Sequence, residues 1–207
     1  MGKQQVDLLA RFLKSGEADH KSYLLHDPSN SKGFGLTHLY SSLMWRALET
    51  ASSVAERLDL PIYGLEDIYE GGGIYLKDAE SGERVGQPGK TPQELQAAFP
   101  RLVLPEGLNP KGWWNRPFET REARKQRGHQ VLNWLLQRHA NKDDRVALFS
   151  HGGFYNDFVR AIMKIEESTA MWLEMNNCGI SRFDFYEDGV SLVYHNRVSF
   201  LPDELIT

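Results

Sequence analysis

A short apolar strand that passes straight into a helix is the feature that most constrains this fold. Residues 145–149 read Arg-Val-Ala-Leu-Phe, and Ser-His-Gly-Gly joins them to an amphipathic segment over 154–163. A continuous apolar run of this length is typical of a strand buried on both faces of a parallel sheet. Parallel strands need helical crossovers, so we predict an α/β fold, a three-layer sandwich with a mostly parallel sheet and helices on both faces.

The same alternation recurs elsewhere in the chain. Residues 36–41 suit a buried strand, helical spacing follows over 43–58, and residues 61–65 suit another short strand. The remaining expectations are a helix at the start of the chain with apolar residues Val6, Leu9 and Leu13, a surface loop over 15–35, a helix over 119–139, and a terminal hairpin formed by residues 180–186 and 190–196.

Residues 66–118 form one long stretch dominated by glycine, proline and charge. Thr91 and Glu94 have the spacing of a capping box and predict one short helix in it. Long connections in compact domains are usually lids or disordered, so we expect a single domain over 1–207 with a lid-like insertion at about 66–118. Its aromatic residues Trp113, Trp114 and Phe118 suit a lid wall or packing. Most of the arginines at its end and just after it are expected on a solvated helix face: Arg116, Arg121, Arg124 and Arg127.

Charge and cysteine content exclude several classes of partner. The chain carries 24 Lys and Arg against 28 Asp and Glu, a formal charge of −4, and it has no basic run suited to nucleic acid or an anionic membrane. Cys178 is its one cysteine, so no internal disulfide can form. The first twenty residues show neither a signal pattern nor a long apolar span, which favours a cytoplasmic location.

His151 occupies the most suggestive position. It follows a buried strand and precedes Gly152 and Gly153 at the start of a helix, and ligand sites of open α/β sheets lie at the carboxyl ends of strands. The glycines let a ligand approach the backbone, and the helix offers free N–H groups to an anion. The plainer interpretation is a glycine turn with a structural histidine. This segment alone favours neither interpretation.

Two further strand ends carry residues suited to phosphate chemistry. Arg46 lies in the first turn of the helix after the strand predicted over 36–41, where its guanidinium can clamp a phosphate. Glu70 precedes three glycines and suits a general acid, provided its pKa is raised. Taken singly, a solvated arginine and an ordinary glycine loop are the more common readings.

The three segments together resemble the histidine phosphatase (phosphoglycerate mutase-like) superfamily over essentially the whole chain. Ser41-Ser42 with Arg46-Ala47, the stretch Asp-Ile-Tyr-Glu-Gly-Gly-Gly at 67–73, and Ser150-His151-Gly152-Gly153 look like its ordered motifs, and residues 193–202 look like its closing strand. The resemblance implies that Arg46 and His151 stabilise charge on the phosphoryl group and that Glu70 manages the proton. It also implies that Ser42 and Gly152 help to bind the substrate.

The resemblance also implies a nucleophilic histidine, but this sequence lacks the motif that carries it. In the family that histidine belongs to an Arg-His-Gly motif at the end of a first strand, and no Arg-His-Gly occurs here. We therefore expect the nucleophile-bearing strand to be missing, through truncation or genuine loss. His38 starts its strand and lies far from the carboxyl end, so it is a poor substitute. The other histidines, His20, His26, His129, His139 and His195, are expected to be structural or solvated.

The expected activity is hydrolysis of phosphoric esters or a phosphomutase reaction through a phosphohistidine, on a small phosphorylated substrate. The rival is a phosphate-binding protein without catalysis. A serine hydrolase using Ser150 ranks low, because the preceding glycine of a nucleophile elbow is absent.

No cofactor or metal is expected, because His129 and His139 are ten residues apart and a single cysteine forms no zinc cluster. A sheet that lacks a strand also favours a homo-oligomer.

Overall fold

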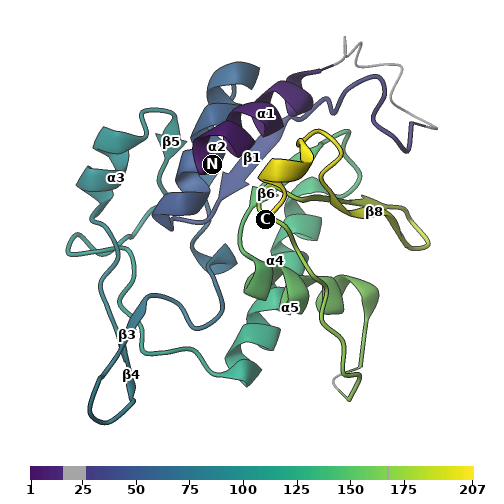
Figure 1. Cartoon of the computed structure of the whole chain (residues 1–207). Helices are drawn as coiled ribbons and strands as arrows, with labels where there is room; N and C mark the ends of the chain where they lie inside the picture. The colour runs from purple at the N-terminus through teal and green to yellow at the C-terminus, as the bar shows by residue number, and fades with distance from the viewer. Residues whose placement is uncertain (16–26, 167) are drawn as a thin grey trace.

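The computed structural model describes residues 1–15, 27–166 and 168–207 (Figure 1). His20, His26 and part of the loop predicted over 15–35 lie outside the described residues. The helices are α1 (Gly2–Lys14), α2 (Trp45–Leu58), α3 (Pro92–Ala98), α4 (Arg121–His139) and α5 (Gly152–Met163), and the 3-10 turns are η1 (Glu66–Ile68) and η2 (Asp203–Leu205). The strands are β1 (His38–Ser41), β2 (Ile62–Gly64), β3 (Tyr75–Lys77), β4 (Arg84–Gly86), β5 (Leu102–Val103), β6 (Val146–Phe149), β7 (Ile180–Phe185) and β8 (Val190–Arg197).

A four-stranded parallel sheet forms the centre of the molecule, with the strand order β5-β2-β1-β6. In the register, Tyr40 of β1 lies opposite Tyr63 of β2 and Leu148 of β6. Two antiparallel hairpins, β3–β4 and β7–β8, accompany the sheet. The predicted terminal hairpin is therefore confirmed.

Helices cover both faces of the sheet. Alternate residues of β6 point to opposite sides: Ala147 and Phe149 pack against the core cluster that includes α1 and α2, whereas Leu148 packs against the cluster of α4 and α5. The helices α1 and α2 contact each other, and α4 contacts α5 (Figure 1). The predicted α/β architecture, with a parallel sheet between two helical layers, is confirmed.

The capping box at Thr91 is also confirmed. The Thr91 hydroxyl accepts from the backbone N–H of Glu94 at 3.2 Å, and the Glu94 carboxylate accepts from the backbone N–H of Thr91 at 2.8 Å. Pro92 stands at the first helical position, where its missing N–H costs nothing. This local chemistry starts α3 inside an otherwise irregular stretch.

The stretch 66–118 is more integrated than a simple lid. Its strand β5 pairs with β2 and forms one edge of the central sheet. Trp113 and Trp114 are buried in the core, so packing is their role. The hairpin β3–β4 projects from the body (Figure 1), and its action as a lid stays a prediction.

An open slot separates β6 from β7. Within the described residues, β6 pairs only with β1 and β7 pairs only with β8. Between them lies a cavity of about 2650 Å³ lined by both strands and by apolar residues such as Leu135, Phe158 and Phe183. The β6 residues are half-buried rather than fully buried as predicted, because this side of the strand faces the slot. Among the described helices, none has the length and hydropathy needed to cross a bilayer.

Candidate active site

The site lies where β1 and β6 end and the helices after them begin. Ser42 follows β1, Arg46 is the second residue of α2, and His151 is the N-cap residue of α5. His151 Nε2 lies 3.0 Å from Ser42 Oγ, and Arg46 Nε donates to His151 Nδ1 at 3.1 Å. Neighbouring parallel strands share one carboxyl edge, so residues remote in sequence converge there. The structure brings these three predicted residues together.

His151 is held as a neutral imidazole. The residue is buried, and this burial, followed by the positive charges of Arg46 and Arg127, lowers its pKa to about 3. A guanidinium can only donate, so His151 Nδ1 must accept from Arg46 and the ring proton must sit on Nε2. That N–H faces Ser42 Oγ and is a donor suited to a phosphoryl oxygen.

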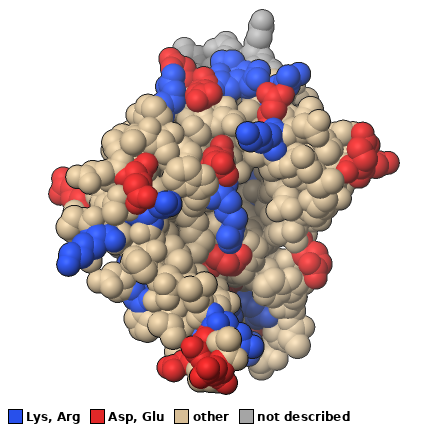
Figure 2. Space-filling view, turned by 60° about the vertical axis from the view of Figure 1, so that its left-hand side comes forward, with Lys and Arg blue, Asp and Glu red and all other residues tan. Residues whose placement is uncertain are grey.

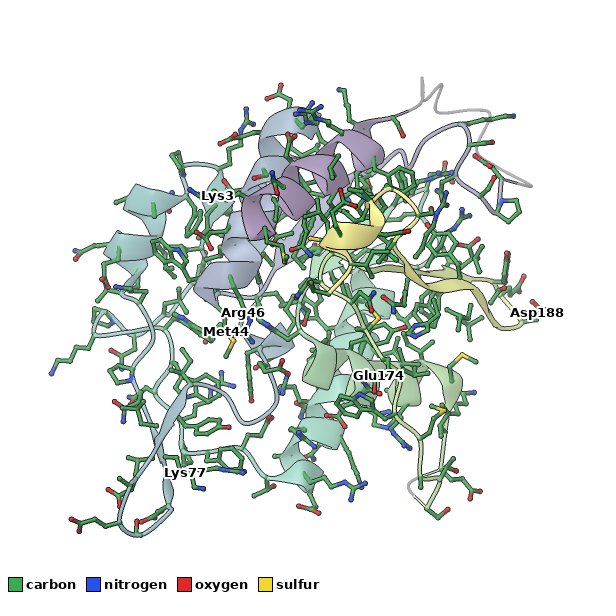
Figure 3. All side chains as sticks on the ribbon, in the orientation of Figure 1. Lys3, Met44, Arg46, Lys77, Glu174 and Asp188 are labelled. Carbon is green, nitrogen blue, oxygen red and sulfur yellow. The ribbon has the colours of Figure 1, made fainter. Side chains whose placement is uncertain are left out.

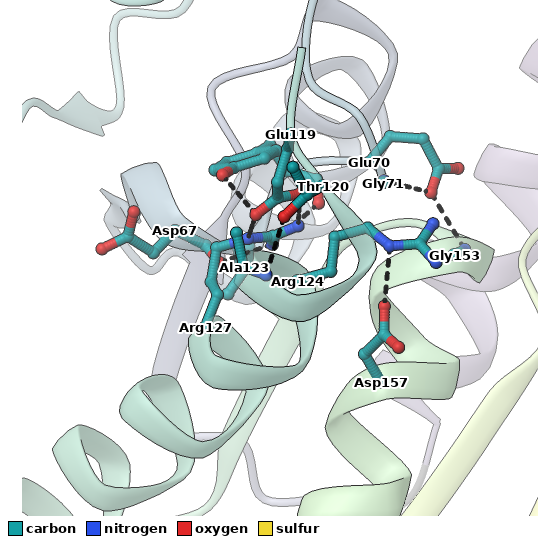
Figure 4. A network of polar contacts seen from close by, with 12 residues as sticks. Asp67, Glu70, Gly71, Glu119, Thr120, Ala123, Arg124, Arg127, Gly153 and Asp157 are labelled. Carbon is teal, nitrogen blue, oxygen red and sulfur yellow. Dashed lines mark hydrogen bonds and ion pairs between the residues drawn. The ribbon is translucent and has the colours of Figure 1, made fainter. Parts of the chain in front are cut away.

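Glu70 reaches the same place from the loop after η1. Its Oε1 accepts from Gly71 N at 2.8 Å and from Gly153 N at 2.9 Å (Figure 4), and its Oε2 lies 3.6 Å from Arg46 Nη2. Gly153 belongs to the first turn of α5, where free N–H groups and the helix dipole favour a negative charge. A Cβ on Gly153 would collide with Glu70 Oε1. A glycine at this position therefore allows the carboxylate to approach the helix.

A buried ion pair that sequence reasoning missed fixes the loop carrying Glu70 (Figure 4). The side chains of Arg127 and Glu119 are only 4% and 6% exposed, and Arg127 Nε and Nη2 donate to the two Glu119 oxygens at 2.7 Å each. Arg127 Nη1 also donates to the carbonyls of Asp67 and Tyr69, and Tyr69 OH donates to Glu119. Arg127 is therefore buried and structural, unlike the solvated face expected for most lid arginines.

The other lid arginines also have partners or face solvent. Arg116 pairs with Asp67 at 3.0 Å and with Glu66 at 3.5 Å. Arg124 Nε lies 3.5 Å from Asp157 Oδ2, beyond good hydrogen-bond geometry, and burial raises the pKa of Asp157. Arg121, in the first turn of α4, is exposed as expected.

Arg46 is the part of the site that faces solvent. Its side chain is 64% exposed, and Figure 3 places it with Met44 near the middle of the molecule, where α2 begins. Figure 2 shows acidic and basic side chains interspersed over one face, without a large field of one sign. An anion can therefore reach the guanidinium from solution, and the positive charge that would attract it is local.

The slot opens into this site. Arg46, Glu70, His151 and Gly152 line the same cavity as β6 and β7. Among the described residues, His151 is the histidine that Arg46 contacts. The other described histidines lie elsewhere: His38 at the start of β1, His129 exposed on α4, His139 at the end of α4, and His195 in β8 beside Tyr155.

Comparison with known proteins gives a family and a fold. The model of the histidine phosphatase superfamily (branch 1) matches residues 29–198, whereas no curated protein sequence matches the chain. A phosphoserine phosphatase mutant from Entamoeba histolytica, solved in complex with phosphoserine, is 17% identical, with a TM-score of 0.57 over 97% of this chain and 84% of that chain.

Two other solved structures are similar to the same extent. YhfR from Bacillus stearothermophilus is 18% identical, with a TM-score of 0.55 over 96% of this chain and 83% of its own. The Entamoeba histolytica phosphoserine phosphatase in complex with 3-phosphoglyceric acid is 20% identical, with a TM-score of 0.55 over 96% and 83%. At such identities the likeness establishes the fold, and function must be argued from the site.

Proposed function

The chain belongs to the histidine phosphatase superfamily, and on that premise we propose that it is a phosphoric-ester hydrolase or phosphomutase whose substrate phosphate binds at Arg46 and His151. The observation that carries the proposal is the contact between Arg46 Nε and His151 Nδ1 at 3.1 Å, with Glu70 beside them. Phosphoryl transfer needs mainly positioning and charge stabilisation, which these groups supply.

Each residue has a distinct proposed role. The exposed end of the Arg46 guanidinium binds two phosphoryl oxygens, and His151 turns its Nε2–H from Ser42 Oγ to a third. Ser42 keeps the imidazole oriented, and Gly152 leaves open space beside the helix N-terminus, where an added Cβ would meet nothing within 4 Å. Glu70 gives a proton to the leaving oxygen and takes one from the attacking water.

The proposed nucleophile is a second imidazole on an extended segment that fills the slot. An imidazole nitrogen attacks phosphorus, the ester oxygen leaves with the proton from Glu70, and water then cleaves the P–N bond and returns a proton to Glu70. The slot supports this placement because, in the part of the chain that the structure describes, β6 pairs with β1 alone, and the same cavity reaches His151. A strand of about five residues beside β6 would end at the site.

The direct test supplies that strand. An apolar peptide ending in Arg-His-Gly is fused through a Gly-Ser linker to the N-terminus, whose Met1 lines the slot, and release of phosphate from an aryl phosphate and from phosphoserine is measured. Activity in the fusion, its loss when the peptide histidine becomes alanine, and its loss in Arg46→Met support the proposal. Arg57→Met is the matched control, because Arg57 lies on the same helix and pairs with Asp7.

Two results would decide against this mechanism. Phosphate release by the unfused chain would place the nucleophile among residues already present. Phosphate release by no form, together with inorganic phosphate binding that Arg46→Met abolishes, would support the alternative of a non-catalytic phosphate-binding protein. One observation supports that alternative: within the described residues, the binding groups are assembled without a second imidazole beside Arg46.

A further inference from the structure

A second cluster of metal-binding side chains lies at the opposite end of β1 from the phosphate site. His38 opens β1, His139 ends α4, and Asp144 lies just before β6. Each offers one ligand atom, and these atoms all lie within 4.8 Å of one another. At about 3.3 Å per strand residue, His38 is roughly 13 Å from Ser42 along β1, so the two places are separate.

We propose that His38, His139 and Asp144 bind a divalent transition-metal ion of the Zn²⁺ type. The Asp144 carboxylate already bridges the two imidazoles: its Oδ2 lies 2.8 Å from His139 Nδ1 and its Oδ1 lies 3.8 Å from His38 Nδ1. The ring centroids of His38 and His139 are 4.8 Å apart. Two imidazoles and one carboxylate suit Zn²⁺ and leave a fourth tetrahedral position for water.

The distances fit a site whose ligand atoms draw together slightly around an ion. Tetrahedral ligands at about 2.1 Å from the metal lie about 3.4 Å from one another, so the cluster must contract by roughly 1.4 Å. The side chains of His38, His139 and Asp144 are 30%, 10% and 20% exposed. The cluster is thus partly desolvated but still accessible to an ion from solution.

Neighbouring groups orient the ligands as the outer shell of a metal site does. Tyr40 OH lies 3.1 Å from His139 Nε2, and Arg138 Nε donates to that same hydroxyl. When a metal takes Nδ1 of His139, the ring proton moves to Nε2 and donates to Tyr40 OH, which is the usual support for a metal-bound histidine. Thr37 Oγ1 lies 2.9 Å from His38 Nδ1, the same nitrogen that faces Asp144, so an ion bound at that nitrogen would displace this contact.

The nearest positive charges limit the expected affinity. Arg138 Nε donates to Tyr40 OH, and Lys142 Nζ donates to the Arg138 carbonyl. Both cations therefore lie beside the cluster. Their repulsion opposes a divalent ion. A bound ion would nevertheless tie together three separate elements, β1, α4 and the start of β6, and would stabilise the folded chain by mass action.

Calorimetric titration of the untagged, chelator-treated chain with ZnCl₂ tests the proposal, alongside visible absorption of the Co²⁺ form. We expect one ion per chain, tetrahedral Co²⁺ bands, and a Zn²⁺-dependent rise in thermal midpoint of about 5 °C. His139→Ala and Asp144→Asn should each weaken binding at least tenfold. His129→Ala is the matched control, because His129 lies exposed on the same helix, and it should bind as the parent does.

Tyr40→Phe keeps all three ligands and so tests the site even if a ligand variant fails to fold. It should weaken Zn²⁺ binding by about tenfold, the effect of removing an outer-shell partner. The proposal is overturned by the absence of stoichiometric binding, or by binding that survives both ligand variants with circular dichroism unchanged. It is equally overturned if His129→Ala abolishes binding.

Discussion

Loss of the Arg127 side chain should damage the fold severely. Replacing it in Arg127→Met leaves the Glu119 carboxylate buried without its cation and removes the donors to two backbone carbonyls. Breaking one partner of a buried pair costs about 3–5 kcal/mol. We expect urea denaturation to show a free energy of unfolding lowered by about that amount, whereas Arg121→Met, on the exposed face of α4, should change it by less than about 0.5 kcal/mol.

A double variant separates the contribution of the ion pair to stability from that of the neighbouring carbonyl contacts. Arg127→Met/Glu119→Leu removes both charges of the pair, so part of the lost stability should return. Full recovery is not expected, because the carbonyls of Asp67 and Tyr69 would still lack the guanidinium. A double variant as unstable as Arg127→Met alone would show that the ion pair contributes little beyond those carbonyl contacts.

His151 should make stability depend on pH. Its pKa is about 3 in the folded chain and about 6.5 in the unfolded chain, so the unfolded chain binds one more proton between these values. The stabilisation is complete above pH 6.5 and is lost as the pH falls toward 3, at no more than about 1.4 kcal/mol per pH unit. Urea denaturation from pH 7 to 4 should give a shallower slope for His151→Gln than for the parent, whereas exposed His129→Gln should keep the parent slope.

The residues of the candidate site were predictable because each follows a strand, and strand ends meet at one edge. Arg46, Glu70 and His151 each carried that local signal. The pair of Arg127 with Glu119 gave no such signal, since its importance comes from burial beneath the loop at 67–69. The contact of His38 with His139 was equally hidden, because their proximity depends on how α4 packs beside β1.

At the scale of elements, the long helices, the hairpin and the strands β1, β2 and β6 match their predictions, whereas the short strands β3, β4 and β5 were not predicted. The helix predicted over 119–139 is α4, and the hairpin predicted over 180–196 is β7–β8. In contrast, β3, β4 and β5 contain only two or three residues each, too few for an alternation of apolar and polar positions to be recognised. Their pairing is decided by tertiary contacts, such as β5 against β2.

The strands of the central sheet should differ in their resistance to opening. β1 is paired on both sides, by β2 and β6, whereas β6 is paired by β1 alone within the described residues. Amide hydrogen exchange should therefore be slower in β1 than in β6 by on the order of tenfold or more. The peptide fusion should slow exchange in β6 and leave β1 unchanged. Equal protection of the two strands in the unfused chain would contradict the assignment of a free edge to β6.

At the scale of the whole molecule, the slot matters for the fold, for the proposed function and for association between copies of the chain. Its apolar walls come from both core clusters, with Phe149 on one side and Phe158 on the other. A sheet edge bordered by apolar surface is a template for another strand. In the proposed mechanism an added strand paired with β6 supplies the nucleophile, whereas a second copy of the chain paired at the same edge would block that strand.

A hydrophobic dye distinguishes a filled slot from an open one. The fluorescence of anilinonaphthalene sulfonate should rise on mixing with the native unfused chain, because a cavity of about 2650 Å³ with apolar walls is accessible. Sedimentation velocity should show association that increases with concentration. Fusion of the strand peptide should suppress both effects, whereas a fused peptide of the same composition with charged residues at alternate positions should suppress neither, since a strand buried on both faces must be apolar throughout. An unfused chain that stays monomeric and does not enhance dye fluorescence would mean that the slot closes in solution.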